Sequence, residues 1–230
     1  MYKSRSWGGD GFNWSLSGGG SSIEESQNLC TLLAELVQGH ANSTSERPST
    51  VRLLDAPMGD WFWMSECLPK MVHALPHGVT LDYQGVDVAA TALAVAERRR
   101  ALVIERAGGS LTLRPFVMVD LAEPSCFRSL PVHRYEIVMC NDALMHLPVA
   151  DIYSALANLN GAGLHGGTFV TNADTRNTDA KLNSDILRAQ FRPVNLRLAP
   201  FHLRGELTTR PSSSRHEILQ TFSFPLQYTK

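Results

Sequence analysis

The chain has 230 residues, of which 43% are hydrophobic and 19% are charged, and its formal net charge is −1. That length suits one sizeable α/β domain, and the near-zero charge excludes a general attraction for nucleic acid or acidic membranes. No apolar run approaches the roughly 18 residues of a membrane-spanning helix, and the first residues lack the apolar core of a secretory signal, so we predict neither.

The first 22 residues are rich in Gly, Ser and Trp and end in Ser17-Gly-Gly-Gly-Ser-Ser22. They allow two interpretations, a flexible leader or a Gly-rich turn that presents backbone amides to a carboxylate or phosphate. Leucines at helical spacing predict a helix over residues 22–37, for which Ser21 or Ser22 is the candidate N-cap. Residues 39–50 are polar, which favours a surface loop.

The rest of the chain alternates short apolar runs with helix-like stretches, a pattern typical of an α/β fold with a parallel sheet. The predicted strands lie at residues 51–54, 80–88, 111–119, 135–140 and 167–171, followed by strand-like runs around Glu206 and at 217–224. The predicted helices lie at residues 60–75, 89–105 and 149–159. Together they predict a Rossmann-like, doubly wound and mostly parallel seven-stranded sheet with helices on both faces.

An acid or amide follows four of the predicted strands: Asp55, Asp87, Asp120 and the pair Asn141-Asp142. The first three are spaced about one βαβ unit apart, roughly 30 residues. Each acid alone is also consistent with an ordinary helix cap. A doubly wound sheet, however, brings the carboxyl ends of its strands to one crevice, so we expect these side chains to form a ligand site.

These positions suit a bound nucleoside. Asp87, at the tip of the second strand, would accept hydrogen bonds from two ribose hydroxyls. Asp120 would accept a hydrogen bond from the exocyclic amine of adenine, and the backbone amide of Leu121 would face a ring nitrogen. The turn after Asp55 contains Gly59, which lets the backbone approach a ligand closely.

The same turn argues against a dinucleotide. A pyrophosphate is bound by a G-x-G-x-x-G turn, whereas Ala56 and Pro57 occupy this one and Pro57 lacks an amide donor. A zwitterionic methionine tail suits the turn better. The aromatic residues Trp61 to Trp63 follow, and they are consistent either with core packing or with one ring lying beneath a sulfonium.

The four cysteines, Cys30, Cys67, Cys126 and Cys140, are scattered along the chain without CxxC spacing. Such spacing is what most zinc sites use, so we predict no metal site. We predict instead reduced, mostly buried thiols and a cytoplasmic location.

Several motifs together resemble the class I S-adenosylmethionine-dependent methyltransferases. The similarity is greater to a bacterial- and viral-type subgroup found alone or fused to sugar-building enzymes. The motifs are Ser17-Gly-Gly-Gly-Ser21, Asp55-Ala-Pro-Met-Gly-Asp60 with Trp63-Met64, Gly85-Val-Asp87, Glu136-Ile-Val-Met-Cys-Asn-Asp-Ala-Leu-Met-His-Leu147, and Arg192-Pro-Val-Asn-Leu196 with Pro200-Phe201. The chain departs from the subgroup's pattern at Met58, Glu136 and Asn141, where Cys, Asp and Arg are usual.

The resemblance implies a single methyltransferase domain over residues 1–230. Residues 1–22 would fold over the cofactor, and residues 23–230 would form the catalytic core. The cofactor would be S-adenosyl-L-methionine, and the acceptor a small polar molecule, with a sugar hydroxyl favoured. The expected cofactor-binding residues are Ser17, Gly18, Ser21, Asp55, Ala56, Pro57, Gly59, Trp63, Asp87, Val88, Asp120, Leu121 and Asn141.

Methylation of a hydroxyl requires a base, and Asp142 and His146 are the candidates. If Asp142 begins a helix, the two residues share a face at i and i+4. Either His146 is the base and Asp142 orients it, or Asp142 is itself the base. His146 is equally consistent with a packing residue that is hydrogen-bonded in the fold.

The sequence leaves the acceptor open. The polar residues Arg192, Asn195, Arg197 and His202 would hydrogen-bond a sugar or would simply close the sheet edge. Methylation of an amine or a protein side chain is the alternative enzymatic activity, and a catalytically silent binding module is the rival from another class. We expect a small-molecule or glycan partner, no nucleic acid and no membrane.

Overall fold

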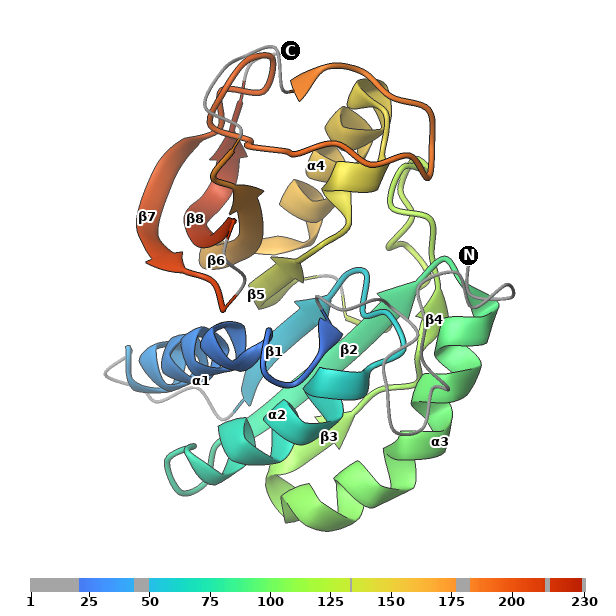
Figure 1. Cartoon of the computed structure of the whole chain (residues 1–230). Coiled ribbons are helices and arrows are strands. Elements are labelled where there is room, and N and C mark those ends of the chain that lie inside the picture. Colours follow the sequence, from blue (N-terminus) through green and yellow to red (C-terminus); the bar gives the residue numbers. More distant parts are fainter. Residues whose placement is uncertain (1–20, 44–49, 133, 177–182, 214–215, 229–230) are drawn as a thin grey trace. The chain divides into compact units, whose positions relative to one another are not determined.

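The computed structural model describes residues 21–43, 50–132, 134–176, 183–213 and 216–228. The chain consists of two compact units, Met1–Met118 and Val119–Lys230. Figure 1 shows both units, coloured from blue at the N-terminus to red at the C-terminus.

The first unit is built on parallel strands in the order β3-β2-β1. The strands are β1 (Thr50–Asp55), β2 (Thr80–Asp87) and β3 (Leu111–Leu113), and the short strand β4 (Val117–Met118) pairs with the end of β2. The sequence predicts one strand over residues 111–119. Two short strands replace it because Pro115 lies between them and has no amide hydrogen for the ladder.

Three helices accompany these strands: α1 (Gln27–Asn42), α2 (Phe62–His73) and α3 (Ala90–Ala107), with a 3-10 turn, η3 (Gly108–Ser110), after α3. Helix α2 packs against both α1 and α3. Its buried face carries Met64, Leu68 and Met71, and Trp61 just before the helix is also fully buried. This is the face that the helical spacing of the sequence predicts.

Helix α1 begins and ends about one turn later than the sequence predicts. The Ser22 hydroxyl accepts a hydrogen bond from the amide of Glu25 at 3.2 Å, so the predicted capping residue starts a turn that leads into the helix. At the other end the helix continues through Gly39 to Asn42. It does so because Ala41, one turn beyond Val37, is also fully buried, and that burial outweighs the weak helix preference of a single glycine.

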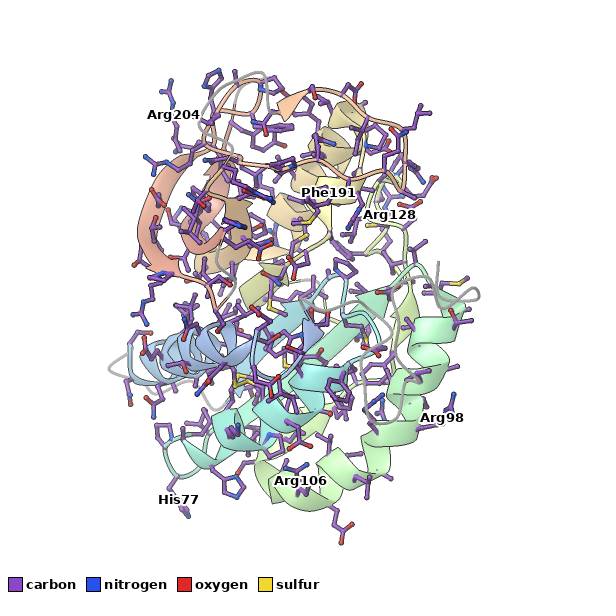
Figure 2. The ribbon with its side chains drawn as sticks, in the orientation of Figure 1. His77, Arg98, Arg106, Arg128, Phe191 and Arg204 are labelled. Carbon is purple, nitrogen blue, oxygen red and sulfur yellow. A yellow bond between two sulfur atoms is a disulfide. The ribbon has the colours of Figure 1, made fainter. Side chains whose placement is uncertain are left out.

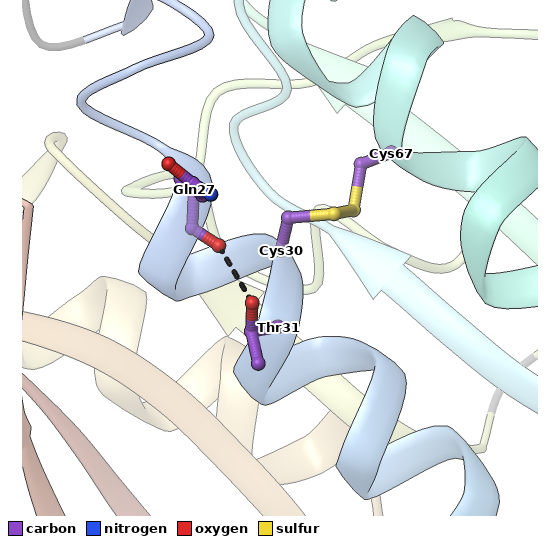
Figure 3. Close-up of a disulfide and its surroundings, with 4 residues drawn as sticks. All are labelled: Gln27, Cys30, Thr31 and Cys67. Atoms are coloured by element: carbon purple, nitrogen blue, oxygen red, sulfur yellow. Dashed lines mark hydrogen bonds between the residues drawn. A yellow bond between two sulfur atoms is a disulfide. The ribbon is translucent and has the colours of Figure 1, made fainter.

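A disulfide between Cys30 on α1 and Cys67 on α2 joins these two helices (Figure 3). The Cα atoms of the two residues are 5.7 Å apart although 37 positions separate them in the chain. The prediction of reduced thiols is therefore wrong for this pair. Cysteine spacing could not reveal it, because only the packing of α1 on α2 brings the two sulfurs together. Cys126 and Cys140 are free thiols.

Helix α3 carries a basic run, Arg98 to Arg100, whose side chains lie partly in solvent and partly against the fold. Arg98 is exposed and points away from the strands (Figure 2), whereas Arg106, further along the helix, donates to the Glu66 carboxylate of α2 at 2.7 Å. Arg100 instead donates hydrogen bonds to the carbonyl oxygens of Leu113 and Arg114. The run therefore helps to hold the chain after β3, in addition to forming a solvated surface.

The second unit contains strands in the order β5-β6-β8-β7. They are β5 (Tyr135–Cys140), β6 (Gly163–Asp174), β7 (Arg204–Pro211) and β8 (Glu217–Gln227). Strands β5 and β6 are parallel, and β8 is antiparallel to both β6 and β7. The 3-10 turn η4 (Leu144–His146) and helix α4 (Val149–Ala162) connect β5 to β6 (Figure 1).

The predicted strands and helices of the second unit are present, with β6 longer at both ends than expected. Residues 173–183 are polar and lack periodicity, so the sequence favours a loop there, but residues 173 and 174 belong to β6. Residues 177–182 of this predicted loop lie outside the described residues. Within the two units, the pairs β1–β2, β2–β3, β2–β4 and β5–β6 are parallel, and the pairs β6–β8 and β7–β8 are antiparallel. In the described part of the chain, no helix has both the length and the apolar character needed to cross a membrane.

We predict that the disulfide makes a measurable contribution to stability. Reduction, or the double substitution of Cys30 and Cys67 by Ser, should lower the free energy of unfolding by about 2–4 kcal/mol, because a closed loop restricts the unfolded chain. Urea unfolding with and without reductant measures the change. Cys126→Ser, which removes a half-buried free thiol, is the control and should keep the response to reductant. A wild-type unfolding midpoint that reductant leaves unchanged would contradict the disulfide.

Candidate functional site

The turn between β1 and α2 is fixed to the end of β2. The amide of Met58 donates to the carbonyl of Val86 at 2.8 Å, and the amide of Gly59 donates to the Asp87 carboxylate at 2.9 Å. Gly59 adopts a left-handed conformation with φ 61°, which favours glycine at this position. The sequence-predicted residues Asp55, Gly59 and Asp87 are therefore brought together within the first unit.

Asp87 is buried, with 4% of its surface exposed. One carboxylate oxygen accepts from Gly59, and the other accepts from the amide of Ala89 at 2.8 Å. Burial raises the pKa of Asp87, and these backbone hydrogen bonds oppose that rise. Each carboxylate oxygen has a second acceptor position, so Asp87 retains the capacity to bind two hydroxyl groups.

Asp55 ends a chain of buried hydrogen bonds. The Trp61 indole Nε1 donates to the Tyr83 hydroxyl at 2.9 Å, and that hydroxyl donates to Oδ2 of Asp55 at 2.5 Å. The other carboxylate oxygen, Oδ1, is buried and has no hydrogen-bond partner among the described residues. Burial raises the pKa of Asp55 to about 8, the Tyr83 hydrogen bond opposes the rise, and the charge of Asp87 adds to it. A buried carboxyl with an unused oxygen is suited to a cationic or hydrogen-bonding ligand group.

The aromatic residues after this turn have different roles. Trp61 is fully buried and packs on Tyr83 and Phe116, with ring centroids 5.9 and 5.0 Å away. Core packing, one of the two interpretations left open by the sequence, therefore describes Trp61. Trp63, the ring expected at the cofactor, is only half-buried on the first turn of α2.

Other residues expected at the cofactor lie nearby in the chain. Ala56 is fully buried, Pro57 is half-buried, and Val88 after β2 is 59% exposed. Ser21 is half-buried at the start of the described residues. Ser17 and Gly18, with most of the segment 1–22, lie outside the described residues.

In the second unit, Asp120 already holds two partners. One oxygen accepts from the amide of Ala122 at 2.9 Å, and the other accepts from the Arg188 guanidinium at 2.8 Å. Arg188 also donates to Asp151 at 2.5 Å. Leu121, next to Asp120, is 7% exposed. An adenine amine at Asp120 would therefore share this carboxylate with Arg188, a partner that the sequence analysis did not identify.

Asp142 is held by two amides. Asn141 donates to one carboxylate oxygen at 2.9 Å and Asn172, at the end of β6, donates to the other at 2.6 Å. The backbone amide of Asp142 returns a hydrogen bond to the Asn172 side chain at 3.0 Å. Burial raises the pKa of Asp142 to about 7, the charge of Glu217 adds to the rise, and both amides oppose it. A carboxylate with this pKa can accept a proton near neutral pH.

His146 is not placed as the shared helical face requires. Asp142 has a positive φ of 54° and begins no helix, and η4 starts only at Leu144. The expectation that the two residues lie on one helical face is therefore wrong, because left-handed backbone interrupts the helix. The Nδ1 atom of His146 lies 3.0 Å from the carbonyl oxygen of Gln190, and its ring lies 5.8 Å from that of Phe191.

The structure adds four residues that the sequence analysis missed. They are Tyr83, which bonds Asp55, Arg188, which bonds Asp120, Asn172, which bonds Asp142, and Glu217, whose charge acts on Asp142. Asn172 was available as the polar residue that follows the fifth predicted strand. Tyr83 and Glu217 carried no signal, because only strand register places them beside the two acids.

No known family model and no curated protein matches the chain. Solved structures do resemble it. One is the N-methyltransferase NodS from Bradyrhizobium japonicum WM9, in complex with S-adenosyl-L-homocysteine, with a TM-score of 0.55 and 14% identity over 97% of this chain and 98% of that chain. Another is an O-methyltransferase family protein from Burkholderia thailandensis, with a TM-score of 0.53 and 17% identity over 87% of this chain. The match spans 56% of the Burkholderia protein.

A third similar structure is the magnesium protoporphyrin IX methyltransferase from Synechocystis PCC 6803, with bound S-adenosyl-L-homocysteine. Its TM-score is 0.51 at 12% identity, over 86% of this chain and 82% of that chain. At such identities the similarity establishes the fold. The chain has the Rossmann-like α/β fold, with a mostly parallel sheet, that these methyltransferases share.

We predict that Asp55 makes stability fall with increasing pH. Its pKa is raised to about 8 in the folded chain, so the folded state keeps a proton that the unfolded state releases above about pH 4. The contribution of this group is complete below about pH 4 and is lost as the pH rises through about 8. The free energy of unfolding of wild type minus that of Asp55→Asn should therefore decrease over this interval and be flat on either side. Urea unfolding of both proteins across the range measures it, and a constant difference would mean that Asp55 has the same pKa in the folded and unfolded states.

We also predict that the pKa of Asp142 depends on Glu217. Glu217→Gln should lower it below about 7, because the charge of Glu217 raises it. Asn172→Ala should shift it upward through loss of the hydrogen bond to the carboxylate. Carboxyl-carbon NMR titration measures both shifts. Glu206→Gln is the control, since Arg197 pairs with that carboxylate at 2.7 Å. Equal titration of Asp142 in wild type and Glu217→Gln would contradict the assignment.

Proposed function

We propose that the chain is a methyltransferase that uses S-adenosyl-L-methionine. The observation that carries the proposal is the buried Asp55 carboxyl with an unused oxygen, next to a glycine turn whose amide is held by Asp87. A methionine tail brings an ammonium group, and a ribose brings two hydroxyls. The ammonium matches the unused oxygen of Asp55, and the two hydroxyls match the second acceptor positions on the oxygens of Asp87. The shared fold with solved methyltransferases supports the same conclusion.

In this proposal the first unit binds the methionine and ribose parts of the cofactor. The methionine ammonium would satisfy Oδ1 of Asp55, and its charge would lower the pKa of that carboxyl from about 8. The remaining residues proposed for this part of the cofactor are Ser17, Gly18, Ser21, Ala56, Pro57, Gly59, Trp63 and Val88.

The second unit would supply Asp120 and Leu121 to adenine, with Asn141 beside the reaction centre. Asp120 accepts an adenine amine only by sharing or releasing Arg188, which now donates to one of its oxygens. We also propose, as the resemblance to methyltransferases implies, that residues 1–230 form one catalytic domain.

When bound, S-adenosylmethionine supplies an activated methyl group on a sulfonium. The chain must then hold an acceptor in line with that group, and orientation of this kind contributes about 7–11 kcal/mol to lowering a barrier. Asp142 is the proposed base, because a carboxyl with a pKa of about 7 accepts the proton of a hydroxyl as it is methylated. A positioned base adds roughly 10²–10⁴-fold. His146, bonded at Nδ1 to Gln190, is the second candidate for this role.

The same observation favours oxygen over nitrogen as the methylated atom. A neutral amine already has a free electron pair, whereas a hydroxyl must lose its proton, and Asp142 is prepared to take one. We therefore propose a polar hydroxyl-bearing acceptor, with a sugar as the leading class. Methylation of an amine or a protein side chain is the alternative, and a catalytically silent binding module is the rival from another class.

The location of the protein is a separate matter. Disulfides persist in oxidising compartments and are rare in the cytosol. The bond between Cys30 and Cys67 therefore weighs against the cytoplasmic location that the sequence predicts.

Calorimetry with S-adenosylmethionine tests the proposed function directly. Wild type should bind it, and Asp87→Asn should bind at least about tenfold more weakly, because charged acceptors make the stronger hydrogen bonds. Asp82→Asn is the control, since that buried carboxylate on the same strand is committed to Arg114. Absence of heat with wild type would exclude a methyltransferase.

The acceptor class needs a second experiment. The chain is incubated with methyl-labelled cofactor and a panel of sugars, small alcohols, amines and protein extract. We expect label on a hydroxyl-bearing small molecule. Label found only on protein or amines would overturn the proposed acceptor while leaving the cofactor proposal intact.

A further inference from the structure

One arginine of the second unit is buried without a full set of partners. Arg192 has 4% of its surface exposed. Its backbone amide donates to the carbonyl of Met145 at 3.1 Å, and its Nη1 donates to the carbonyl of Leu147 at 2.7 Å. Its Nε and Nη2 atoms are buried and have no hydrogen-bond partner in the part of the chain that the structure describes. The guanidinium is therefore anchored at one nitrogen and unsatisfied at the other two.

The two unsatisfied nitrogens form one edge of the guanidinium. The N–H bonds at Nε and Nη2 are parallel, so this edge fits both oxygens of a carboxylate. The chain uses the same edge elsewhere. Arg114 binds Asp82 through Nε at 2.8 Å and Nη2 at 2.7 Å, and Arg176 binds Asp174 through the same two atoms. Arg192 presents this edge with no carboxylate on it.

A buried, unpaired edge of this kind is costly. An unsatisfied buried donor loses its hydration without replacement, and the loss is greater for a charged group. Burial lowers the pKa of Arg192, and the charge of Asp185 only partly opposes this. Asp185 makes no hydrogen bond to Arg192, because its Oδ1 accepts from the amides of Val149 and Ile186 instead. Among the described residues, the fold therefore supplies no carboxylate for the edge.

The anchoring contacts place Arg192 beside the candidate base His146. Met145 and Leu147, whose carbonyls Arg192 holds, are the neighbours of His146 on either side. Phe191, which directly precedes Arg192, lies with its ring 5.8 Å from that of His146 and is 54% exposed (Figure 2). A group bound at Arg192 would thus be next to His146, the second candidate base of the proposed function.

From these contacts we infer that Arg192 binds a carboxylate carried by the methyl acceptor. The acceptor would then be an acidic hydroxyl compound, such as a sugar acid, rather than a neutral sugar. That the bound carboxylate belongs to the methyl acceptor rests on the proposed function, whereas the carboxylate site at Arg192 does not. Because both nitrogens are buried, binding requires the surrounding chain to open. The adjoining residues 184–191 are largely exposed and form neither helix nor strand.

The carboxylate site is tested first with sodium acetate, on the full chain and without cofactor. The Nε–H resonance of Arg192, identified by its absence in Arg192→Lys, should shift saturably with acetate and not with sodium chloride at equal ionic strength. Acetate should also raise the unfolding temperature of wild type above the value in chloride, as ligands of the folded state do. Arg192→Lys keeps the charge but lacks the two-pronged edge, so it should lose this gain.

Two further variants make the result decisive. Arg192→Gln should lose the acetate response even if Arg192→Lys is poorly folded. Arg128→Lys alters an exposed arginine of the same unit that has no place in the proposed site, and it should keep the response. An Nε–H resonance that acetate does not shift, or an equal gain in Arg192→Lys, would overturn the site. If the Nε–H proton contacts only water, and acetate does not change that contact, a buried water satisfies the guanidinium edge. That result would also overturn the carboxylate site.

The acceptor class is tested by comparing glucuronate with glucose under labelled cofactor. The KM of the wild type for glucuronate should be at least about tenfold lower than its KM for glucose, in line with the strength of a charge-assisted pair. Arg192→Lys should lose this preference with little change in kcat and no change in cofactor affinity by calorimetry. Equal use of the two sugars by wild type would overturn the acidic acceptor. Failure of wild type to bind the cofactor would instead overturn the proposed function and leave the acetate result standing.

Discussion

The hydrogen bond from the Gly59 amide to the Asp87 carboxylate is the contact on which the first unit's site depends. It joins the turn after β1 to the end of β2 at 2.9 Å, so the two strand ends cannot move independently. It also fixes the position of the carboxyl that precedes the turn, Asp55, whose partner Tyr83 comes from β2 as well. Two neighbouring parallel strands thereby present two acids in a defined arrangement, as a doubly wound sheet is suited to do.

Sequence predicted most of the fold because its signals are local. Apolar runs ending in an acid located β1, β2 and β5, and helical spacing located α2, α3 and α4. What it missed depends on packing between distant segments. Residue spacing could not show that Cys30 meets Cys67, or that α1 would continue past Gly39 to bury Ala41.

The site was predictable to the same extent. The acids Asp55, Asp87, Asp120 and Asp142 were identified from their positions after strands, which requires only the order of elements. Their partners were not, since Tyr83, Asn172 and Arg188 are distant in sequence and reach these acids through strand register and loop packing. The condition for a helical face shared by Asp142 and His146 is not met, because Asp142 has a left-handed backbone and begins no helix. Residue composition does not reveal that conformation.

Buried polar atoms without hydrogen-bond partners occur in the described residues at two kinds of position. Some lie within strands, on Gln84, Gln220 and Thr221, where neighbouring ladder contacts surround them. Those on Asp55, Asn141 and Arg192 lie instead at a strand end or on an irregular segment. Each unsatisfied group lowers the free energy of unfolding, and together they are a substantial cost for a marginally stable fold. The cost is offset when a ligand brings the missing partners: an ammonium for Asp55 and a carboxylate for Arg192. The unsatisfied groups would then lower the stability of the chain without ligand. They would also make binding selective, because a ligand without the ammonium or the carboxylate would leave Asp55 or Arg192 unsatisfied.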